Sequence, residues 1–529
     1  MFFLLKKYEY TCIFVYCVIL TLVAQAVPFF WDNVLLASKI AQFYYENRFS
    51  SLILPQSLDS GHPPFYGMYL AVVWMLFGKS LPAAHWAVLP FLVGLGIAYY
   101  RLLCYILPRR YAFWGLIFLF AEPAFLTQSV LAGIDIPLVG AHLLLLQGLL
   151  YRQRKAVMFG AIGLCLFSLR GILTAFFIGL CDVLLCLYRG ERHIGAVLKN
   201  TFPAWLPALT ITAVWYVYHY YNAGFLAINH HSVWATDPDS LHYKYANLNA
   251  FLRNVAIVGW RFLDQGRVIV WLILGYGFYS YYYKARKIIN SQQGCVAGRQ
   301  IEWLIVCFLP LVFMTIIVAA RHNPIMPRYF LTYFLLLPPT ALYLLVGERQ
   351  KSATGAGLSF LKLNDKKLNE NANTPKTQPI NTPQTAIPQK QVAVAAVLMA
   401  VSLLSGHFWI YPYPVANSWD TTLRCLPYFG VKQKMYNYMN ARHIPFDQTA
   451  SAFPLLAAPK YTDLDEGDSR TLIPVGSRPQ RDFAYFCVSN CSNEFKPADL
   501  QRLQAPPWQM ESRFENKGIW IELYRQIGN

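Results

Sequence analysis

The chain has 529 residues; 56% of them are hydrophobic and only 14% are charged. Soluble domains carry about 25% charged residues, so this composition excludes an ordinary soluble protein. The net charge of +18 is divided among short basic clusters between apolar stretches, which argues against nucleic-acid binding. Many apolar stretches approach the roughly 20 residues that cross a bilayer as a helix. The sequence predicts a polytopic, mainly α-helical membrane protein.

The first apolar stretch, at residues 10–30, follows Lys6 and Lys7 and lacks a small-residue cleavage site. We therefore expect a retained signal-anchor helix. Basic clusters end the later spans that run inward, as the positive-inside rule describes. These clusters are Arg152, Arg154 and Lys155; Arg189, Arg192 and Lys199; and Lys284, Arg286 and Lys287. This pattern places the N-terminus in the cytoplasm and the C-terminal tail outside.

About eight later spans follow from these clusters. They are expected at residues 136–151, 156–169, 172–188, 202–221, 267–283, 302–320, 329–346 and 391–411. Three apolar stretches precede them, at 64–78, 84–107 and 111–127, and must cross an even number of times. Either one of these is re-entrant or two form one broken crossing. The total is about eleven spans, with twelve or thirteen as alternatives.

Apart from the spans, two outer segments and one inner loop stand out. Residues 31–63 form a first outer loop within a transmembrane module of residues 1–346. Residues 247–264 have an amphipathic pattern, which is typical of a helix on the membrane surface. Residues 347–390 are rich in Lys, Asn, Thr, Pro and Gln, a composition that predicts a disordered cytoplasmic loop.

Residues 412–529, after the last span, predict a small α/β or α+β domain outside the membrane. We expect helices at 432–441 and 497–503, a strand at 482–488, and a hairpin at 511–524 that turns at residues 515–518. Cys487 and Cys491 lie in this domain. An oxidising compartment would allow them to pair, but strand geometry separates side chains four residues apart. Their pairing stays open.

Ionisable side chains beside the outer membrane face are costly, so they are candidates for function. Cations there can bind a phosphate, and a carboxylate can accept a proton from an attacking hydroxyl. A site for an anionic, phosphate-bearing substrate is therefore predicted at this face. The candidates are Asp32, His62, Glu122, Asp135, Arg170, Arg321, His322 and Arg328.

Each candidate also has a purely structural interpretation. Arg170 and Arg328 are compatible with interfacial anchors whose guanidiniums reach toward water. The two aspartates are compatible with helix caps and His62 with a turn residue. Glu122 is compatible with a hydrogen-bonded buried carboxylate.

Cofactor motifs are missing from the sequence. His230, His231 and His242 have irregular spacing, which argues against a metal site, and no phosphate-binding glycine loop or dinucleotide motif is present. These features argue against an ATP-driven pump and against a soluble type of nucleotide-sugar enzyme.

Several short segments occur in an order that resembles a known superfamily. They are Trp31-Asp32-Asn33, Gly61-His62-Pro63-Pro64, residues 123–129 with Gly133-Ile134-Asp135-Ile136-Pro137, Arg170 in its hairpin, and Pro327-Arg328-Tyr329. Over about residues 8–346 the chain resembles the GT-C membrane glycosyltransferases. The likeness is to the family-39-like group of protein O-mannosyltransferases, lipid A aminoarabinose transferases and Rgt-type transferases.

The resemblance implies transfer of a sugar from a polyprenyl-phosphate donor to a lipid, glycan or protein acceptor on the outer face of the membrane. It implies that Asp32 is the general base and Asp135 a second carboxylate. Arg328 with Arg321 would hold the lipid phosphate, and Arg170 would assist. A divalent cation is compatible with this chemistry. Asn33 stands where protein mannosyltransferases tend to carry Glu, so the acceptor class stays open.

Two other function classes fit a polytopic chain with charges near the membrane. A secondary transporter or flippase would show interrupted helices in two related halves, and the sequence contains no such repeat. A non-catalytic scaffold with the same fold is the second alternative. Under the transferase interpretation, we expect the protein in a bacterial cytoplasmic membrane.

Overall fold

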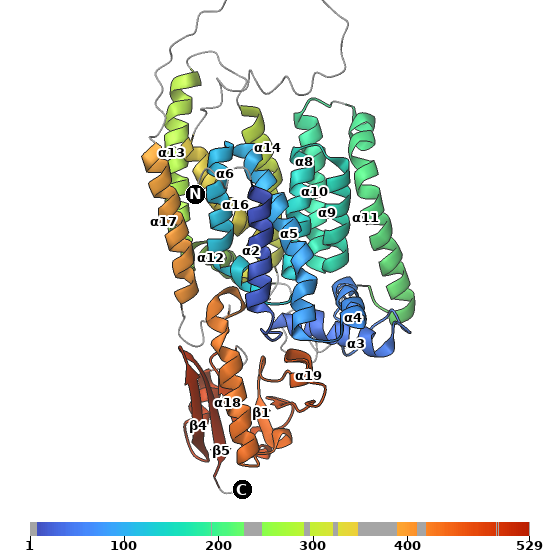
Figure 1. Cartoon of the computed structure of the whole chain (residues 1–529), viewed down its shortest axis with the longest axis vertical. Helices are drawn as coiled ribbons and strands as arrows, with labels where there is room; N and C mark the ends of the chain where they lie inside the picture. Colours follow the sequence, from blue (N-terminus) through green and yellow to red (C-terminus); the bar gives the residue numbers. More distant parts are fainter. Residues whose placement is uncertain are drawn as a thin grey trace, which may run out of the picture.

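The computed structural model describes residues 8–191, 193–226, 246–289, 297–320, 326–346, 389–409, 419–492, 495 and 497–527. Most of these residues form a bundle of roughly aligned helices, and a small domain with a sheet lies at one end, where the chain terminates (Figure 1). The predicted fold class, a mainly helical membrane bundle with a small C-terminal α/β domain, is confirmed.

The bundle helices match the predicted spans closely. They are α2 (Glu9–Ala24), α5 (Leu81–Ile106), α6 (Arg109–Ala121), α8 (Asp135–Leu150), α9 (Arg154–Phe167), α10 (Leu169–Tyr188), α11 (Ile194–Ala223), α13 (Val268–Ile289), α14 (Ala297–Cys307), α15 (Leu309–Ala319), α16 (Leu331–Val346) and α17 (Gln389–Ser405). Five described spans are long and apolar enough to cross a membrane, or six if one bent pair is counted. The predicted count of eleven to thirteen also needs the shorter helices, and it stays a prediction.

The three apolar stretches before residue 130 have different roles. Helix α4 (Phe65–Phe77) has 13 residues and rises about 20 Å, less than the roughly 30 Å of a hydrocarbon core. Lys79, just after it, pairs with Glu466 of the C-terminal domain at 2.7 Å. Helix α4 therefore stays near the domain end of the bundle, as Figure 1 also shows. Helix α5 then crosses, and α6 returns with α7 (Pro123–Val130) at a 63° bend.

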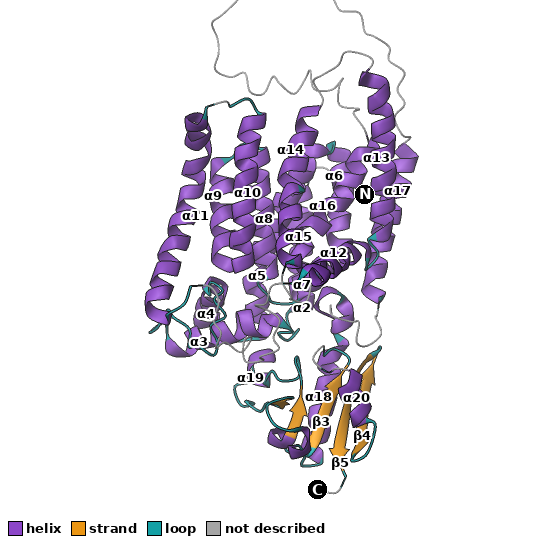
Figure 2. Cartoon of the chain, turned by 180° about the vertical axis from the view of Figure 1, so that it is seen from behind, coloured by secondary structure: helices purple, strands orange, loops and turns teal. Residues whose placement is uncertain are grey.

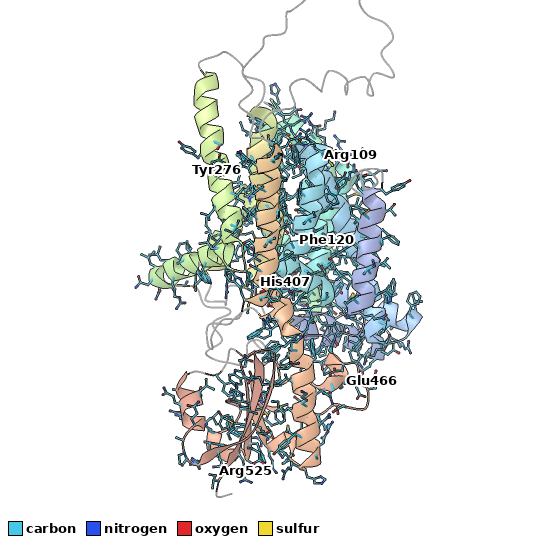
Figure 3. The ribbon with its side chains drawn as sticks, turned by 60° about the vertical axis from the view of Figure 1, so that its left-hand side comes forward. Arg109, Phe120, Tyr276, His407, Glu466 and Arg525 are labelled. Carbon is cyan, nitrogen blue, oxygen red and sulfur yellow. The ribbon has the colours of Figure 1, made fainter. Side chains whose placement is uncertain are left out.

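Helix α12 (Leu248–Leu263) lies across the bundle axis rather than along it (Figures 2 and 3). Ala250, Asn254 and Val258 are buried at a four-residue spacing, and large apolar side chains such as Leu252 and Trp260 are exposed. This arrangement agrees with the predicted amphipathic helix at 247–264. Its place on a membrane surface stays a prediction.

The C-terminal domain has a five-stranded mixed sheet in the order β2-β1-β3-β5-β4. Its strands are β1 (Thr449–Ser451), β2 (Ile473–Pro474), β3 (Tyr485–Ser489), β4 (Trp508–Asn516) and β5 (Ile519–Gln526), and its helices are α18 (Pro427–Ala441), α19 (Pro459–Thr462) and α20 (Pro497–Leu503). The predicted helices, strand and hairpin are present. The hairpin turns at Lys517 and Gly518, both with positive φ, as a tight two-residue turn requires.

The domain packs directly on the bundle rather than hanging from it. Trp419 and Tyr428 share a buried apolar cluster with Phe30, Trp31 and Met326. Figure 3 shows His407 just after α17, at the end of the bundle that faces the domain.

The cysteine pair of the domain is not joined. Cys487 and Cys491 are buried free thiols, and the Sγ atom of Cys487 lies 3.4 Å from the Sδ atom of Met435. The disulfide that the sequence left open is therefore absent from this structure. The 347–390 loop was predicted to be disordered, and its residues 347–388 lie outside the described residues.

Candidate active site

Arg328 lies at the centre of a buried ion cluster at the domain end of the bundle. It belongs to the short 3-10 turn Pro327–Phe330 that directly precedes α16, and its side chain is only 4% exposed. Its Nη2 atom pairs with Asp32, and its Nη1 atom lies 3.3 Å from Oδ2 of Asp135. Its Nε atom lies 3.2 Å from Oδ2 of Asp420. One guanidinium thus joins three carboxylates from distant parts of the chain.

Asp32 is presented by a tight turn after α2. The preceding residue, Trp31, has φ of 54°, a conformation that non-glycine residues adopt at a cost of about 1–3 kcal/mol. Packing of its ring against Phe453, at 4.9 Å between centroids, holds it there. On the other side, a Cβ at Gly133 would lie 2.1 Å from Oδ1 of Asn33. A side chain at Gly133 would therefore push the Asp32 turn away from the segment that precedes Asp135.

Asp135 is the first residue of α8 and is 1% exposed. A negative charge is favourable at this position because the helix N-terminus carries a partial positive charge. Its two oxygens contact two arginines: Oδ1 lies 2.5 Å from Nη2 of Arg170 and Oδ2 faces Arg328. The carboxylates of Asp32 and Asp135 thus pair with guanidiniums and make no side-chain cap to a helix.

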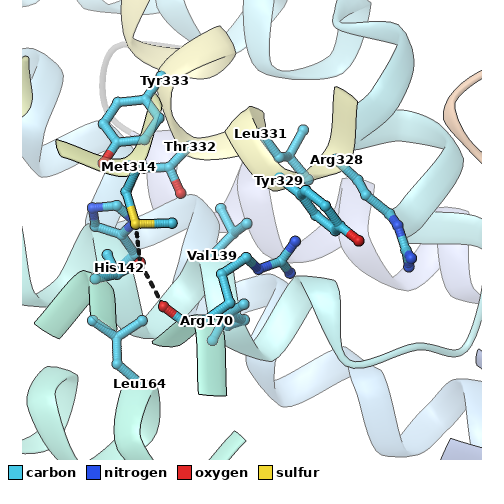
Figure 4. Close-up of a pocket in the computed structure, with 12 residues that line it drawn as sticks. Val139, His142, Leu164, Arg170, Met314, Arg328, Tyr329, Leu331, Thr332 and Tyr333 are labelled. Carbon is cyan, nitrogen blue, oxygen red and sulfur yellow. Dashed lines mark hydrogen bonds between the residues drawn. The ribbon is translucent and has the colours of Figure 1, made fainter. Parts of the chain in front are cut away.

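Arg170 is in the first turn of α10. Ser168 separates α9 from α10, and its Oγ atom accepts a hydrogen bond from the backbone N–H of Arg170 at 3.2 Å. The ring of Tyr329 lies between the two arginines, 4.9 Å from Cζ of Arg170 and 5.7 Å from Cζ of Arg328 (Figure 4). Both guanidiniums therefore gain a cation–π contact. They also line a cavity of about 20 Å³, which is enough for about one water molecule.

His62 lies beside this cluster. Its Nδ1 atom is 3.4 Å from Oγ of Ser168, and burial together with the Arg170 charge lowers its pKa to about 4. Its loop is fixed by Asp59, which accepts a hydrogen bond from Gly61 N at 2.9 Å and pairs with His219 at 2.8 Å. His62 is therefore a neutral neighbour of Arg170 near pH 7.

Glu122 pairs with an arginine that is not part of the Arg328 cluster. Its Oε2 atom accepts a hydrogen bond from Phe125 N at 2.6 Å and caps α7, while Oε1 pairs with Arg267, whose Nε is 3.1 Å away. Arg267 also contacts Asp264 at 3.0 Å. This geometry is that of the hydrogen-bonded buried carboxylate, which was the alternative interpretation of Glu122.

Some candidates lie outside the described residues. These are Arg321 and His322, together with the histidines His230, His231 and His242. Within the described part of the chain, no group of three or more His, Cys, Asp or Glu side chains could hold a metal ion.

Asp420 contacts Arg328 but is not among the candidates that the sequence indicates. It lies in the 3-10 turn Trp419–Thr421 at the start of the C-terminal domain and is 1% exposed. Burial raises the pKa of its carboxyl, Arg328 opposes the rise and Asp135 adds to it. The available signal was an acidic residue soon after a predicted span, the same criterion that selected Asp32.

The charges and exposures indicate what the cluster can do. Three carboxylates and two guanidiniums give it a formal charge of −1 when all are ionised. Asp32 is 15% exposed and Arg170 is 19% exposed, whereas the other three side chains are 4% exposed or less. One base, Asp32, and one cation, Arg170, are therefore accessible to a ligand. The buried side chains of Asp135, Arg328 and Asp420 hold them in place.

Comparisons with known proteins gave three solved structures. No family model and no curated protein matches the chain. The chain is similar to ArnT from Cupriavidus metallidurans bound to undecaprenyl phosphate (15% identity) and in the apo state (14%), each with a TM-score of 0.45 and 98% of both chains covered. It is also similar to the arabinofuranosyltransferase AftD from Mycobacteria at 12% identity and a TM-score of 0.43, which covers 99% of this chain and 40% of that one.

Proposed function

We propose that this protein is a membrane glycosyltransferase of the GT-C type. It would take a sugar from a polyprenyl-phosphate donor at the outer face of the membrane and transfer it to a lipid, glycan or protein acceptor. The observation that carries the proposal is the cluster in which Arg328 joins Asp32 and Asp135, with Arg170 beside them. Its residues fall within the sequence segments that resemble this superfamily.

The roles follow from exposure and charge. Asp32, the most exposed carboxylate of the cluster, removes the proton from the acceptor hydroxyl as its oxygen attacks the sugar C1. The bond from C1 to the phosphate oxygen breaks, and the polyprenyl phosphate leaves with the electron pair. Arg170 and Arg328 neutralise the charge that grows on that phosphate. Asp135 touches both arginines and fixes their spacing.

The orientation that we propose places the site outside a bacterial cytoplasmic membrane, with the N-terminus in the cytoplasm. The basic clusters at Arg152 and Arg189 support it, because they follow α8 and α10 at the bundle end opposite the C-terminal domain (Figure 1). A membrane-impermeant lysine reagent tests it on intact cells. Labelling of Lys517, which is exposed on the domain, is expected, and protection of that lysine in intact but not lysed cells would reverse the orientation.

The proposed activity is tested with purified protein in nanodiscs and a panel of labelled polyprenyl-phosphate sugars. Wild-type protein should transfer or slowly hydrolyse one sugar, and Asp32→Asn should lose at least about 100-fold in turnover while it still binds polyprenyl phosphate. Asp447→Asn, at an exposed carboxylate of the domain, is the matched control. Unchanged turnover in Asp32→Asn would refute the base assignment. Movement of the intact donor across the bilayer without cleavage would favour a flippase, and binding without either process would favour a scaffold.

A further inference from the structure

The turn that carries Asp420 is clamped from two sides. From the membrane bundle, Gln128 donates to the backbone oxygen of Asp420 at 2.8 Å, and Gln265 donates to Oγ1 of Thr421 at 2.8 Å. From the C-terminal domain, the backbone oxygen of Asn490 accepts a hydrogen bond from Nε1 of Trp419 at 2.9 Å. The position of Asp420 therefore depends on both parts of the molecule at once.

Its carboxylate is held differently from its backbone. Neither oxygen has a hydrogen-bond partner within the described part of the chain, and neither has Nε of Arg328. The 3.2 Å approach of these two groups is thus an ion pair without an aligned hydrogen bond. A buried carboxylate without hydrogen bonds is costly. Asp32 and Asp135 already pair with Arg328, so Asp420 is not needed to neutralise the guanidinium. Asp420 therefore does more than pair a cation.

We propose that Asp420 is a positioning residue for the transferase reaction, through which the C-terminal domain completes the active site. The inference rests on the proposed function. Asp420 occupies the Nε edge of Arg328, so that Nη1 and Nη2 face Asp135 and Asp32. Because Asp420 adds a negative charge to the cluster, it strengthens Asp32 as a base and weakens the hold of the arginines on a phosphate.

Two effects of opposite sign follow from removal of this charge. Asp420→Asn keeps the size of the side chain and an oxygen that faces Arg328. The arginines should then bind the anionic phosphate more tightly, and Asp32 should accept a proton less readily. Each effect should be on the order of tenfold, as expected for one unit charge several ångströms away at a partly buried site.

The experiment measures both quantities on the full-length protein. The dissociation constant for a short-chain polyprenyl phosphate should fall, and kcat for the labelled donor should also fall. A merely structural role would weaken binding and slow turnover together. The control Asp447→Asn should change neither quantity. If Asp420→Asn does not fold, Trp419→Phe replaces it in the experiment. This variant removes the hydrogen bond to Asn490 and should produce both changes in smaller size.

A double-mutant cycle provides a readout that does not depend on activity. Asp420→Asn and Arg328→Gln should lower the midpoint of thermal unfolding by less in combination than the sum of the single changes. Strict additivity would overturn the inference, and so would binding and kcat within twofold of wild type in Asp420→Asn. If wild-type protein neither binds polyprenyl phosphate nor turns over, the proposed function fails, whereas the cycle still decides whether Asp420 acts through Arg328.

Discussion

Replacement of Arg328 tests the site most directly. Arg328→Gln removes one positive charge from a cluster of three carboxylates and two guanidiniums, and its formal charge changes from −1 to −2. Removal of one partner from a buried ion pair costs about 3–5 kcal/mol. Arg328 is 4% exposed and meets three carboxylates, so we expect Arg328→Gln to lower the free energy of unfolding by an amount near the upper end, about 5 kcal/mol. The loss of a preorganised cation at the leaving group should lower kcat by about 10²–10³.

Arg328→Lys separates the charge from its geometry. Lysine keeps the charge, but its single ammonium cannot present three nitrogens in a planar fork to three carboxylates. We expect a smaller loss of stability than in Arg328→Gln but a loss of kcat that approaches it. Stability is followed by intrinsic fluorescence on heating in detergent, and kcat is measured in nanodiscs with the labelled donor. If Arg328→Gln kept more than a tenth of wild-type kcat with an unchanged unfolding midpoint, the central role of Arg328 would be refuted.

Three further outcomes are expected. Arg170→Gln should raise KM for the donor, and it should lower the unfolding midpoint less than Arg328→Gln does, because Arg170 is the more exposed cation. An unchanged KM would show that Arg170 does not bind the donor phosphate. Glu122→Gln should lower the unfolding midpoint, because it leaves Arg267 buried with less compensation, and kcat of the surviving protein should stay within a few-fold of wild type; a selective loss of kcat would return Glu122 to the site. The pKa of His62 lies near 4 in the folded protein against about 6.5 in unfolded chains, so its stabilising contribution is complete above pH 6.5 and is lost as the pH falls toward 4. His62→Gln should therefore lose less of its unfolding midpoint than wild type between pH 7 and pH 5, and parallel curves would contradict this.

The meeting of four charged side chains at one end of the bundle could be predicted from the sequence because of a general property of antiparallel bundles. Asp32, Asp135, Arg170 and Arg328 each lie at the end of an apolar stretch, and the basic clusters orient those stretches. Ends with the same orientation must lie at the same level of the bundle, so the four residues fall on one face. Their direct contact with one another also depends on details such as the left-handed turn at Trp31, which no periodicity reveals.

Other features depend on tertiary contacts that a linear pattern does not contain. The two interpretations of Glu122 could not be separated from the sequence because its partner Arg267 is 145 residues away. The acidic residue Asp420 follows the last span, yet its role depends on how the C-terminal domain docks. The path of α4 was ambiguous because 13 apolar residues are too few for a straight crossing but long enough to resemble one.

The cluster is an expensive way to join the bundle to the domain. Ion pairs in a buried junction are often no better than apolar packing of the same volume, and the adjacent contact between Trp31 and Phe453 shows that apolar packing is available there. The cluster also leaves one carboxylate in excess and two side chains, Asp32 and Arg170, partly open to solvent. A junction built for stability alone would be neutral and closed. The excess negative charge and the partial exposure of Asp32 and Arg170 are instead what the proposed site needs if a hydroxyl is to reach a base and a phosphate is to reach a cation.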